Sequence, residues 1–192
     1  MRKPSAELEV RKPSKAELLR VEGKTVPDVI AARLKVLFCG INPGLYSGWA
    51  GHHFARPGNR FWPALFASGF TQRLVRPEEE HELLRLGFGI TNLVERATLA
   101  SGELSHKELV AGGRALEEKV RKYHPRSVAI LGVSAYRLAF DQPEAMVGRQ
   151  SQKMGDALVW VLPNPSGLNA HFTPKTLARL FRQFRLYLAN SV

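Results

Sequence analysis

The chain has 192 residues, of which 44% are hydrophobic and 23% charged, and this composition is typical of a single globular domain. A formal net charge of +11 favours a polyanionic partner, most simply nucleic acid, whose phosphates attract basic proteins whatever the base sequence. The single cysteine, Cys39, excludes an intrachain disulfide, and no apolar run is long enough to span a membrane. Because the N-terminus also lacks the apolar core of a secretory signal, we expect a cytoplasmic protein.

The first 24 residues are predicted to form a basic, flexible N-terminal arm. Arg2–Leu8 is nearly repeated by Arg11–Leu18, and residues Ser14 to Glu17 have the form of a helix-capping box. Such an arm either lies on DNA phosphates or is a disordered, solubilising tail, and both interpretations stay open. Residues 25–192 are predicted to form one folded domain.

A buried strand is predicted at Val36–Cys39, where apolar residues follow one another without a polar break. Gly40-Ile41-Asn42-Pro43-Gly44 ends this strand abruptly and opens a long loop. Ligands of α/β proteins bind beyond the carboxyl ends of parallel strands, so the loop would place the Asn42 carboxamide where a ligand binds. A tight turn with a structural asparagine is the alternative interpretation of this motif taken alone.

Helices and strands alternate along the rest of the chain. Capping and periodicity signals predict helices near residues 27–34, 59–68, 77–86 and 105–123, after 134, and at 173–189, with strands at 88–94, 127–132 and 158–162. This alternation predicts an α/β fold with a central, mainly parallel four-stranded sheet and helices on both faces.

The last predicted strand also ends in an Asn-Pro motif, Pro163-Asn164-Pro165-Ser166-Gly167-Leu168-Asn169. Two strands that are far apart in the sequence therefore end in loops of similar chemistry. The segment around the second loop is basic, with six Lys or Arg residues and one acid, Asp156, between residues 149 and 192. A solvated helix face would explain several of these charges, and the neighbouring loop favours DNA as their partner.

Three motifs in this order resemble those of the mismatch-specific uracil/thymine-DNA glycosylases of the uracil-DNA glycosylase superfamily. They are Gly40-Ile41-Asn42-Pro43-Gly44, then Phe54-Ala55 followed by Pro57 and Asn59-Arg60-Phe61-Trp62, and finally Asn164-Pro165-Ser166-Gly167-Leu168. The resemblance covers residue 26 to the C-terminus. It implies the three-layer α/β/α sandwich of that superfamily, with residues 25–192 as a DNA glycosylase catalytic domain.

The resemblance also implies a role for each of these residues in the hydrolysis of the N-glycosidic bond of an extruded base. Asn42 would hold the attacking water, because a carboxamide accepts and donates hydrogen bonds but is no base near neutral pH. Phe54 would stack on the base, and Leu168 would be the wedge that fills the hole in the duplex. A place in the apolar core is the alternative for both side chains.

The predicted site residues fall into three groups. They are the catalytic residue Asn42; the base-binding pocket of Gly40, Ile41, Pro43, Phe54 and Asn164; and the wedge and backbone contacts Pro165, Ser166, Gly167, Leu168 and Asn169. Faster members of the superfamily have Asp and His at the positions of Asn42 and Asn164, so we expect a slow enzyme.

Some residues depart from the pattern of the family. Asn92 stands where relatives often have Lys, so a positive charge is absent there. Glu95 could help to position water, although a surface carboxylate or a partner of Arg96 is the favoured interpretation. His52 and His53 stand where smaller or aromatic residues are expected, which leaves the base preference open. Adjacent histidines alone seldom hold a metal, and we expect neither a metal nor another cofactor.

The predicted function is base excision repair by a monofunctional, metal-free hydrolase that flips out uracil and removes it from G-mismatched double-stranded DNA. Thymine and etheno-cytosine are further candidate bases. We expect a monomer that binds mismatched or damaged DNA in the bacterial nucleoid and does not contact membranes. Two alternatives stay open: a uracil-DNA glycosylase of another family that also acts on single strands, and a non-catalytic mismatch-binding module.

Overall fold

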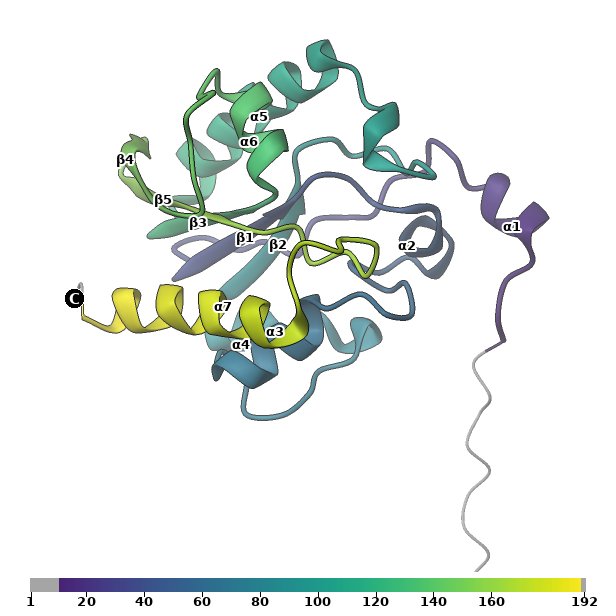
Figure 1. Ribbon diagram of the computed structural model, residues 1–192, viewed down its shortest axis with the longest axis horizontal. Helices are drawn as coiled ribbons and strands as arrows, with labels where there is room; N and C mark the ends of the chain where they lie inside the picture. The colour runs from purple at the N-terminus through teal and green to yellow at the C-terminus, as the bar shows by residue number, and fades with distance from the viewer. Residues whose placement is uncertain (1–10, 191–192) are drawn as a thin grey trace, which may run out of the picture.

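The structure of the protein is a computed structural model in which residues 11–190 are described. Five strands form one central sheet in the order β2-β1-β3-β5-β4 (Figure 1). The strands are β1 (Val36–Gly40), β2 (Phe88–Asn92), β3 (Ser127–Leu131), β4 (Gly148–Met154) and β5 (Ala157–Leu162). The pairs β1–β2, β1–β3 and β3–β5 are parallel, whereas β4 is an antiparallel edge strand. The four parallel strands therefore end at the same edge of the sheet.

Helices cover both faces of the sheet, which gives a three-layer α/β/α sandwich (Figure 1). One face is covered by α5 (His106–Tyr123) and α6 (Val133–Ala139), and the other by α3 (Phe61–Ser68), α4 (Glu82–Leu86) and α7 (Pro174–Ala189). The loops contain α1 (Lys15–Leu19), α2 (Leu45–Ala50) and the 3-10 turns η1 (Pro77–Glu79) and η2 (Ser101–Glu103). Between residues 11 and 190, no helix has the length and apolar character needed to cross a membrane.

An apolar core lies on each side of the sheet, and β1 contributes to both. Phe38 packs with Phe61 of α3 and Phe181 of α7 in one core. Its neighbours Leu37 and Cys39 belong to the other core, together with residues of α5 and α6. Successive side chains of a strand point to opposite faces, so a strand that is buried on both faces must be apolar throughout. The loop that follows β1 therefore begins at a rigid point of the molecule.

The predicted α/β sandwich is confirmed, with five strands in place of four. The additional strand β4 is polar and mostly exposed, so it lacks the apolar pattern by which the other strands are predicted. The helix predicted near residues 27–34 is wrong, because Val29 instead exchanges two main-chain hydrogen bonds with Ile90 of β2. The predicted helix caps at Ser105 and Thr173 are confirmed.

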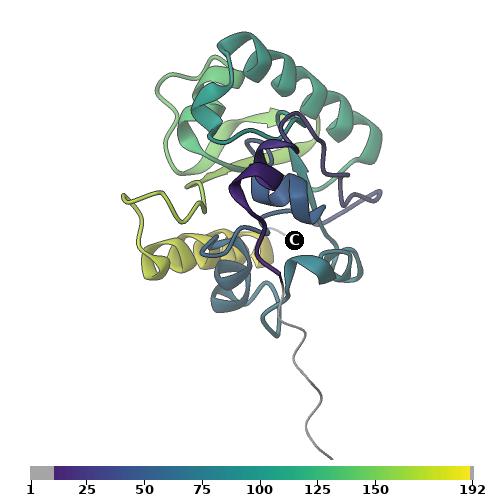
Figure 2. The same ribbon diagram turned by 90° about the vertical axis from the view of Figure 1, so that its right-hand side faces the viewer.

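The chain joins the domain before residue 24. Ser14 and Glu17 form the predicted capping box at the start of α1. Val21, just after α1, is buried against Leu45 and Ala97, and Leu18 of α1 packs on the same cluster. The helix α1 therefore lies beside α2, on the side of the molecule that faces the viewer in Figure 2. The predicted division at residue 24 stays a prediction, and the first ten residues of the predicted arm lie outside the described part of the chain.

Candidate active site

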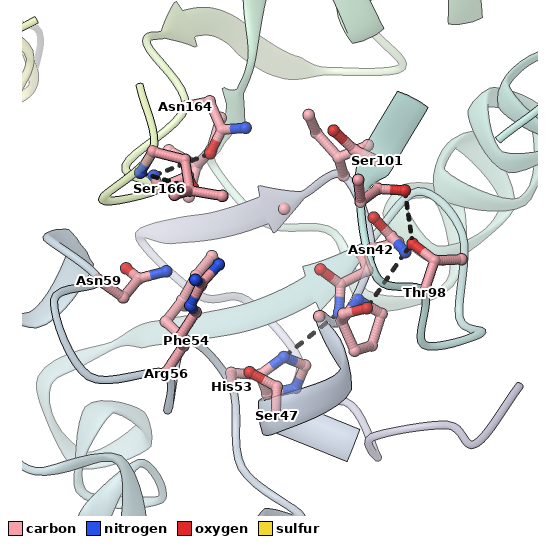
Figure 3. A pocket seen from close by; sticks show the side chains of 18 of the residues that line it. Asn42, Ser47, His53, Phe54, Arg56, Asn59, Thr98, Ser101, Asn164 and Ser166 are labelled. Carbon is pink, nitrogen blue, oxygen red and sulfur yellow. Dashed lines mark hydrogen bonds between the residues drawn. The ribbon is translucent and has the colours of Figure 1, made fainter. Parts of the chain in front are cut away.

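A pocket of about 310 Å³ lies at the carboxyl edge of the parallel strands (Figure 3). Its walls come from residues 40–44, 47, 53, 54, 56, 59, 92, 98–101, 131, 164, 166, 168 and 169, so the loops after β1, β2 and β5 all contribute. Pockets of this size hold small molecules in many proteins. Of the predicted site residues, those that line it are Gly40, Ile41, Asn42, Pro43, Phe54, Asn164, Ser166, Leu168 and Asn169.

Asn42 is held by its amide nitrogen. Nδ2 donates to the carbonyl oxygens of Pro43 and Arg96, both at 3.1 Å, and to the hydroxyl oxygen of Thr98 at 2.7 Å. The Thr98 hydroxyl donates its own proton to the carbonyl oxygen of Ala100 at 2.9 Å, so towards Asn42 it can only accept. The three acceptors fix the direction of the carboxamide. Asn42 therefore presents its oxygen to the pocket, and this oxygen has no hydrogen bond to any residue between 11 and 190.

Asn92, which ends β2, is oriented by a buried histidine. His53 is only 2% exposed, and burial lowers its pKa, so the ring is neutral near neutral pH. Its Nε2 lies 2.9 Å from the carbonyl oxygen of Pro27, which can only accept, so Nε2 carries the ring proton. Nδ1 then accepts from Nδ2 of Asn92 at 3.3 Å. The oxygen of Asn92 is thereby turned towards Gly40, where the Cβ of any other residue would overlap it.

A buried carboxylate fixes the loop that carries His53. Glu80 is 3% exposed, and it accepts from the His53 main-chain N–H at 2.8 Å and from Nδ1 of His52 at 2.9 Å. The side chain of Trp62 donates to the His53 carbonyl oxygen at 3.2 Å. The side chains of the two adjacent histidines therefore have different partners, Glu80 for His52, and the Pro27 carbonyl oxygen and Asn92 for His53. No cluster of three or more His, Cys, Asp or Glu residues suited to a metal ion is present in the described part of the chain.

Phe54 packs against the apolar core and also lines the pocket. One face of its ring stacks on Phe61, with ring centroids 4.1 Å apart and planes inclined by 28°, so it is anchored to the core. Its ring edge lies close to Gly40 at the pocket wall. The backbone of Phe54 has φ of +53°, a left-handed conformation that is rare for a bulky residue and is concentrated at functional sites.

The carboxamide of Asn164, after β5, is turned the opposite way to those of Asn42 and Asn92. Its Oδ1 accepts from the Ser166 N–H at 3.0 Å, within the loop. The amide nitrogen of Asn164 is consequently the end that points into the pocket (Figure 3). Leu168, at the tip of the same loop, is 70% exposed. This exposure favours a surface role for Leu168 over a place in the core.

Pro165 and Gly167 are not among the residues that line the pocket. Pro165 is buried, and its carbonyl oxygen accepts from the Arg60 N–H at 2.9 Å. Gly167 lies so close to the preceding loop that a Cβ there would be 2.5 Å from the carbonyl oxygen of Gly58. Both residues therefore shape the loop that carries Leu168.

Sequence reasoning did not place Asn92 and Thr98 in the site. Asn92 is paired with Gly40 in the register of β1 and β2, so a polar residue at the end of the neighbouring strand was the available signal. Thr98 has no such signal, since it follows β2 in an irregular segment. It forms the wall opposite Asn164 together with Ser101 (Figure 3).

Glu95 lies outside the pocket lining. Its side chain is 62% exposed and forms an ion pair of 3.2 Å with Lys119. Of the two favoured interpretations, the surface carboxylate is therefore confirmed. The other, pairing with Arg96, does not occur, because Arg96 is bound by Glu108 at 2.6 Å. Cys39 is completely buried, and burial raises its thiol pKa well above the ordinary value, in keeping with its predicted role as a small apolar residue.

The fold and the pocket define a class of α/β/α proteins that bind a ligand at the carboxyl edge of a parallel sheet. The sequence model of the uracil DNA glycosylase superfamily matches residues 27–186. The chain therefore belongs to the uracil DNA glycosylase superfamily, whose members act on DNA and hydrolyse N-glycosidic bonds.

A solved structure shows the same fold. It is the solution NMR structure of a candidate uracil DNA glycosylase from Methanosarcina acetivorans, which is 21% identical in sequence and superimposes with a TM-score of 0.55. The match covers 85% of the present chain and 98% of the other chain. The α/β/α sandwich implied by the sequence resemblance is thus confirmed.

Proposed function

We propose that the protein is a monofunctional glycosylase that removes uracil from G-mismatched double-stranded DNA, with thymine and etheno-cytosine as further candidate bases. The observation that carries this proposal is a set of three carboxamides in one pocket whose directions are fixed. Asn42 and Asn92 present oxygen, and Asn164 presents nitrogen.

The directions of Asn92 and Asn164 suit the pairing edge of uracil, which carries one N–H between two carbonyl groups. The Asn92 oxygen can accept from that N–H, and the Asn164 nitrogen can donate to a carbonyl that gains negative charge as the glycosidic bond breaks. Cytosine has a lone pair in place of this N–H. It would face the Asn92 oxygen without a hydrogen bond, which disfavours its binding.

Asn42 suits the role of holding water. Its oxygen can accept a hydrogen bond from a water molecule and leave a lone pair of that water free to attack C1′. The sugar resembles an oxocarbenium ion in the transition state of glycoside hydrolysis, so a positioned water needs little activation. No lysine is among the residues that line the pocket in the described part of the chain, so the lining offers no amine for a covalent intermediate.

A preference for mismatches follows from a slow chemical step. No Asp or Glu is among those lining residues, so the lining offers no carboxylate base to activate the water. A slow enzyme depends on how readily the nucleotide leaves the duplex, and unpairing costs least where the base is already mismatched. Leu168, exposed at the tip of the loop after β5, would fill the hole that the nucleotide leaves.

A uracil glycosylase that ignores the opposing base is the second candidate, and Asn92 favours it. A carboxamide that reads the pairing edge of uracil directly needs no information from the other strand. Such an enzyme would also act on uracil in single strands.

Single-turnover release of free base tests the proposal. The substrates are matched duplexes with U·G, U·A, T·G or no lesion, and the single strand that carries uracil. We expect the fastest release from U·G and little from the single strand, whereas equal rates on both would favour the second candidate. In the matched control Asn42→Ala, release should fall on the order of a hundredfold with DNA affinity nearly unchanged. Intact DNA binding without release of any base would contradict the proposal.

A further inference from the structure

Arg60 connects the start of α3 to the loop between β5 and α7, residues 163–172, which we call the wedge loop. Nη1 donates to the carbonyl oxygens of Asn169 at 3.0 Å and Phe172 at 2.6 Å, and Nη2 donates to that of Gly167 at 3.1 Å. The Arg60 main-chain N–H donates to the carbonyl oxygen of Pro165 at 2.9 Å. A single residue thus binds the main chain of the wedge loop at four points.

The other hydrogen bonds of the wedge loop are local. Ser166 binds Asn164, the Leu168 N–H donates to the Ser166 hydroxyl at 3.3 Å, and the Asn169 side chain donates to the Asn164 carbonyl oxygen at 3.0 Å. Such bonds shape turns but do not attach them to the domain. Arg60 provides an attachment, because the next residue, Phe61, is completely buried in the core.

The guanidinium group suits this role better than other cations. Its planar fork donates in several fixed directions at once, which a point charge does not. By holding the Asn169 carbonyl inward, it also turns the N–H of Ala170 outward, because C=O and N–H point in opposite directions in a trans peptide. Carbonyl dipoles that would repel a phosphate are thus drawn away from the surface.

We propose that Arg60 is the positioning residue for the wedge: it holds the wedge loop in the one shape that presents Leu168 to the duplex. The expected effect of Arg60 on uracil release rests on the proposed function, whereas its effect on the shape of the wedge loop does not. Arg60 touches neither base nor water in this role. It acts through the main chain that carries Leu168.

Two variants separate the effect of the forked guanidinium geometry of Arg60 from the effect of its positive charge. Arg60→Met removes both, and Arg60→Lys keeps the charge without the fork. In the free protein, main-chain amides 166–172 should exchange hydrogen faster in Arg60→Met. In single-turnover assays at saturating enzyme, Arg60→Met should slow uracil release about tenfold or more from U·A, less from U·G, and least where uracil has no partner. Arg60→Lys should restore only part of the rate.

Arg185→Met is the matched control. Arg185 donates one hydrogen bond of 2.8 Å to the Ser68 carbonyl oxygen, at the other end of α3, so this variant loses the same charge but leaves the wedge loop attached. It should change neither the amide exchange nor the ranking of substrates. In the double variant with Leu168→Ala, adding Arg60→Met should lower the rate of uracil release little further. Both changes impair the same wedge, so their effects are not additive.

Amide exchange that is unchanged in Arg60→Met would overturn the inference. An equal loss on all three substrates, fully restored by Arg60→Lys, would overturn it as well, because it would show that Arg60 only attracts phosphate. Absence of base release by the unaltered protein would instead contradict the proposed function. The amide exchange of Arg60→Met would still decide whether Arg60 holds the loop.

Discussion

The amide nitrogen of Asn42 lies 2.7 Å from the hydroxyl oxygen of Thr98, and this bond joins the exit of β1 to the segment after β2. The main chains of the two segments are also joined, because the Thr98 N–H donates to the Pro43 carbonyl oxygen at 3.1 Å. A buried threonine outside every sequence motif therefore helps the Pro43 and Arg96 carbonyl oxygens to fix which end of Asn42 faces the pocket.

Replacing Thr98 by valine should disturb Asn42 while keeping nearly the same side-chain volume in the pocket wall. Thr98→Val removes the nearest of the three acceptors of Nδ2, so the carboxamide is held less firmly by the Pro43 and Arg96 carbonyl oxygens alone and the water loses part of its fixed position. We expect single-turnover base release to fall about tenfold, with a loss of stability of about 1–3 kcal/mol from the broken buried hydrogen bonds. Thr98→Ser keeps the hydroxyl and should recover most of the rate. Equal rates for the two variants would show that Thr98 acts only through packing.

Replacing Asn92 by alanine should weaken recognition of uracil itself. The oxygen that accepts from the base is lost, so release should fall by about tenfold or more and by a similar factor from U·G, U·A and single-stranded uracil. The comparison of the three rates is the measurement. A loss confined to well-paired uracil would mean that Asn92 acts in extrusion instead of recognition.

The pH dependence of stability should reveal the buried His53. Its folded-state pKa is lowered by burial, so between that pKa and the unfolded value of about 6.5 the unfolded chain binds more protons. The stabilising contribution of neutral His53 is therefore complete above about pH 6.5, declines as the pH falls below it, and is lost below the folded-state pKa. Protonation also places a donor at Nδ1 opposite the Asn92 amide, so uracil release should fall with stability.

Melting temperatures of His53→Ala and of the unaltered protein, measured from pH 7.5 to 5, check this expectation. His53→Ala should be less stable at neutral pH and should show a smaller decline towards acid. His106→Gln is the control, because this exposed histidine at the start of α5 should leave the slope unchanged. Parallel curves for His53→Ala and the unaltered protein would count against the assignment.

Truncation of Leu168 should separate extrusion from folding. The side chain is 70% exposed, so Leu168→Ala should change the unfolding free energy by no more than about 0.5 kcal/mol. Uracil release should fall most from U·A, less from U·G, and least where uracil has no partner, because a wedge offsets the cost of unpairing. Thermal unfolding and the three rates are measured together. A large drop in melting temperature with no ranking of substrates would exclude the wedge.

The helices and strands that the sequence predicts well depend on residues close to one another in the sequence. The capping box of Ser105 and Glu108 spans three residues, and Thr173 with Pro174 starts α7 in the same local way. Apolar runs predict the four parallel strands, because strands buried on both faces must be apolar throughout. Residues 27–34 lack a helix because Val29 is bound to Ile90, a distant partner that no local pattern reveals.

The sequence by itself also predicted that Asn42 and Asn164 lie at one pocket, because both follow strand ends that share one edge of the sheet. The directions of the Asn42 and Asn92 carboxamides were decided only by the tertiary structure. A carboxamide can face either way, and its partners settle which: Asn42 is held by Thr98, 56 positions away, and Asn92 by His53, 39 positions away. Hydrogen bonds between such distant segments form only once the sheet has brought them together, so no local pattern can reveal them.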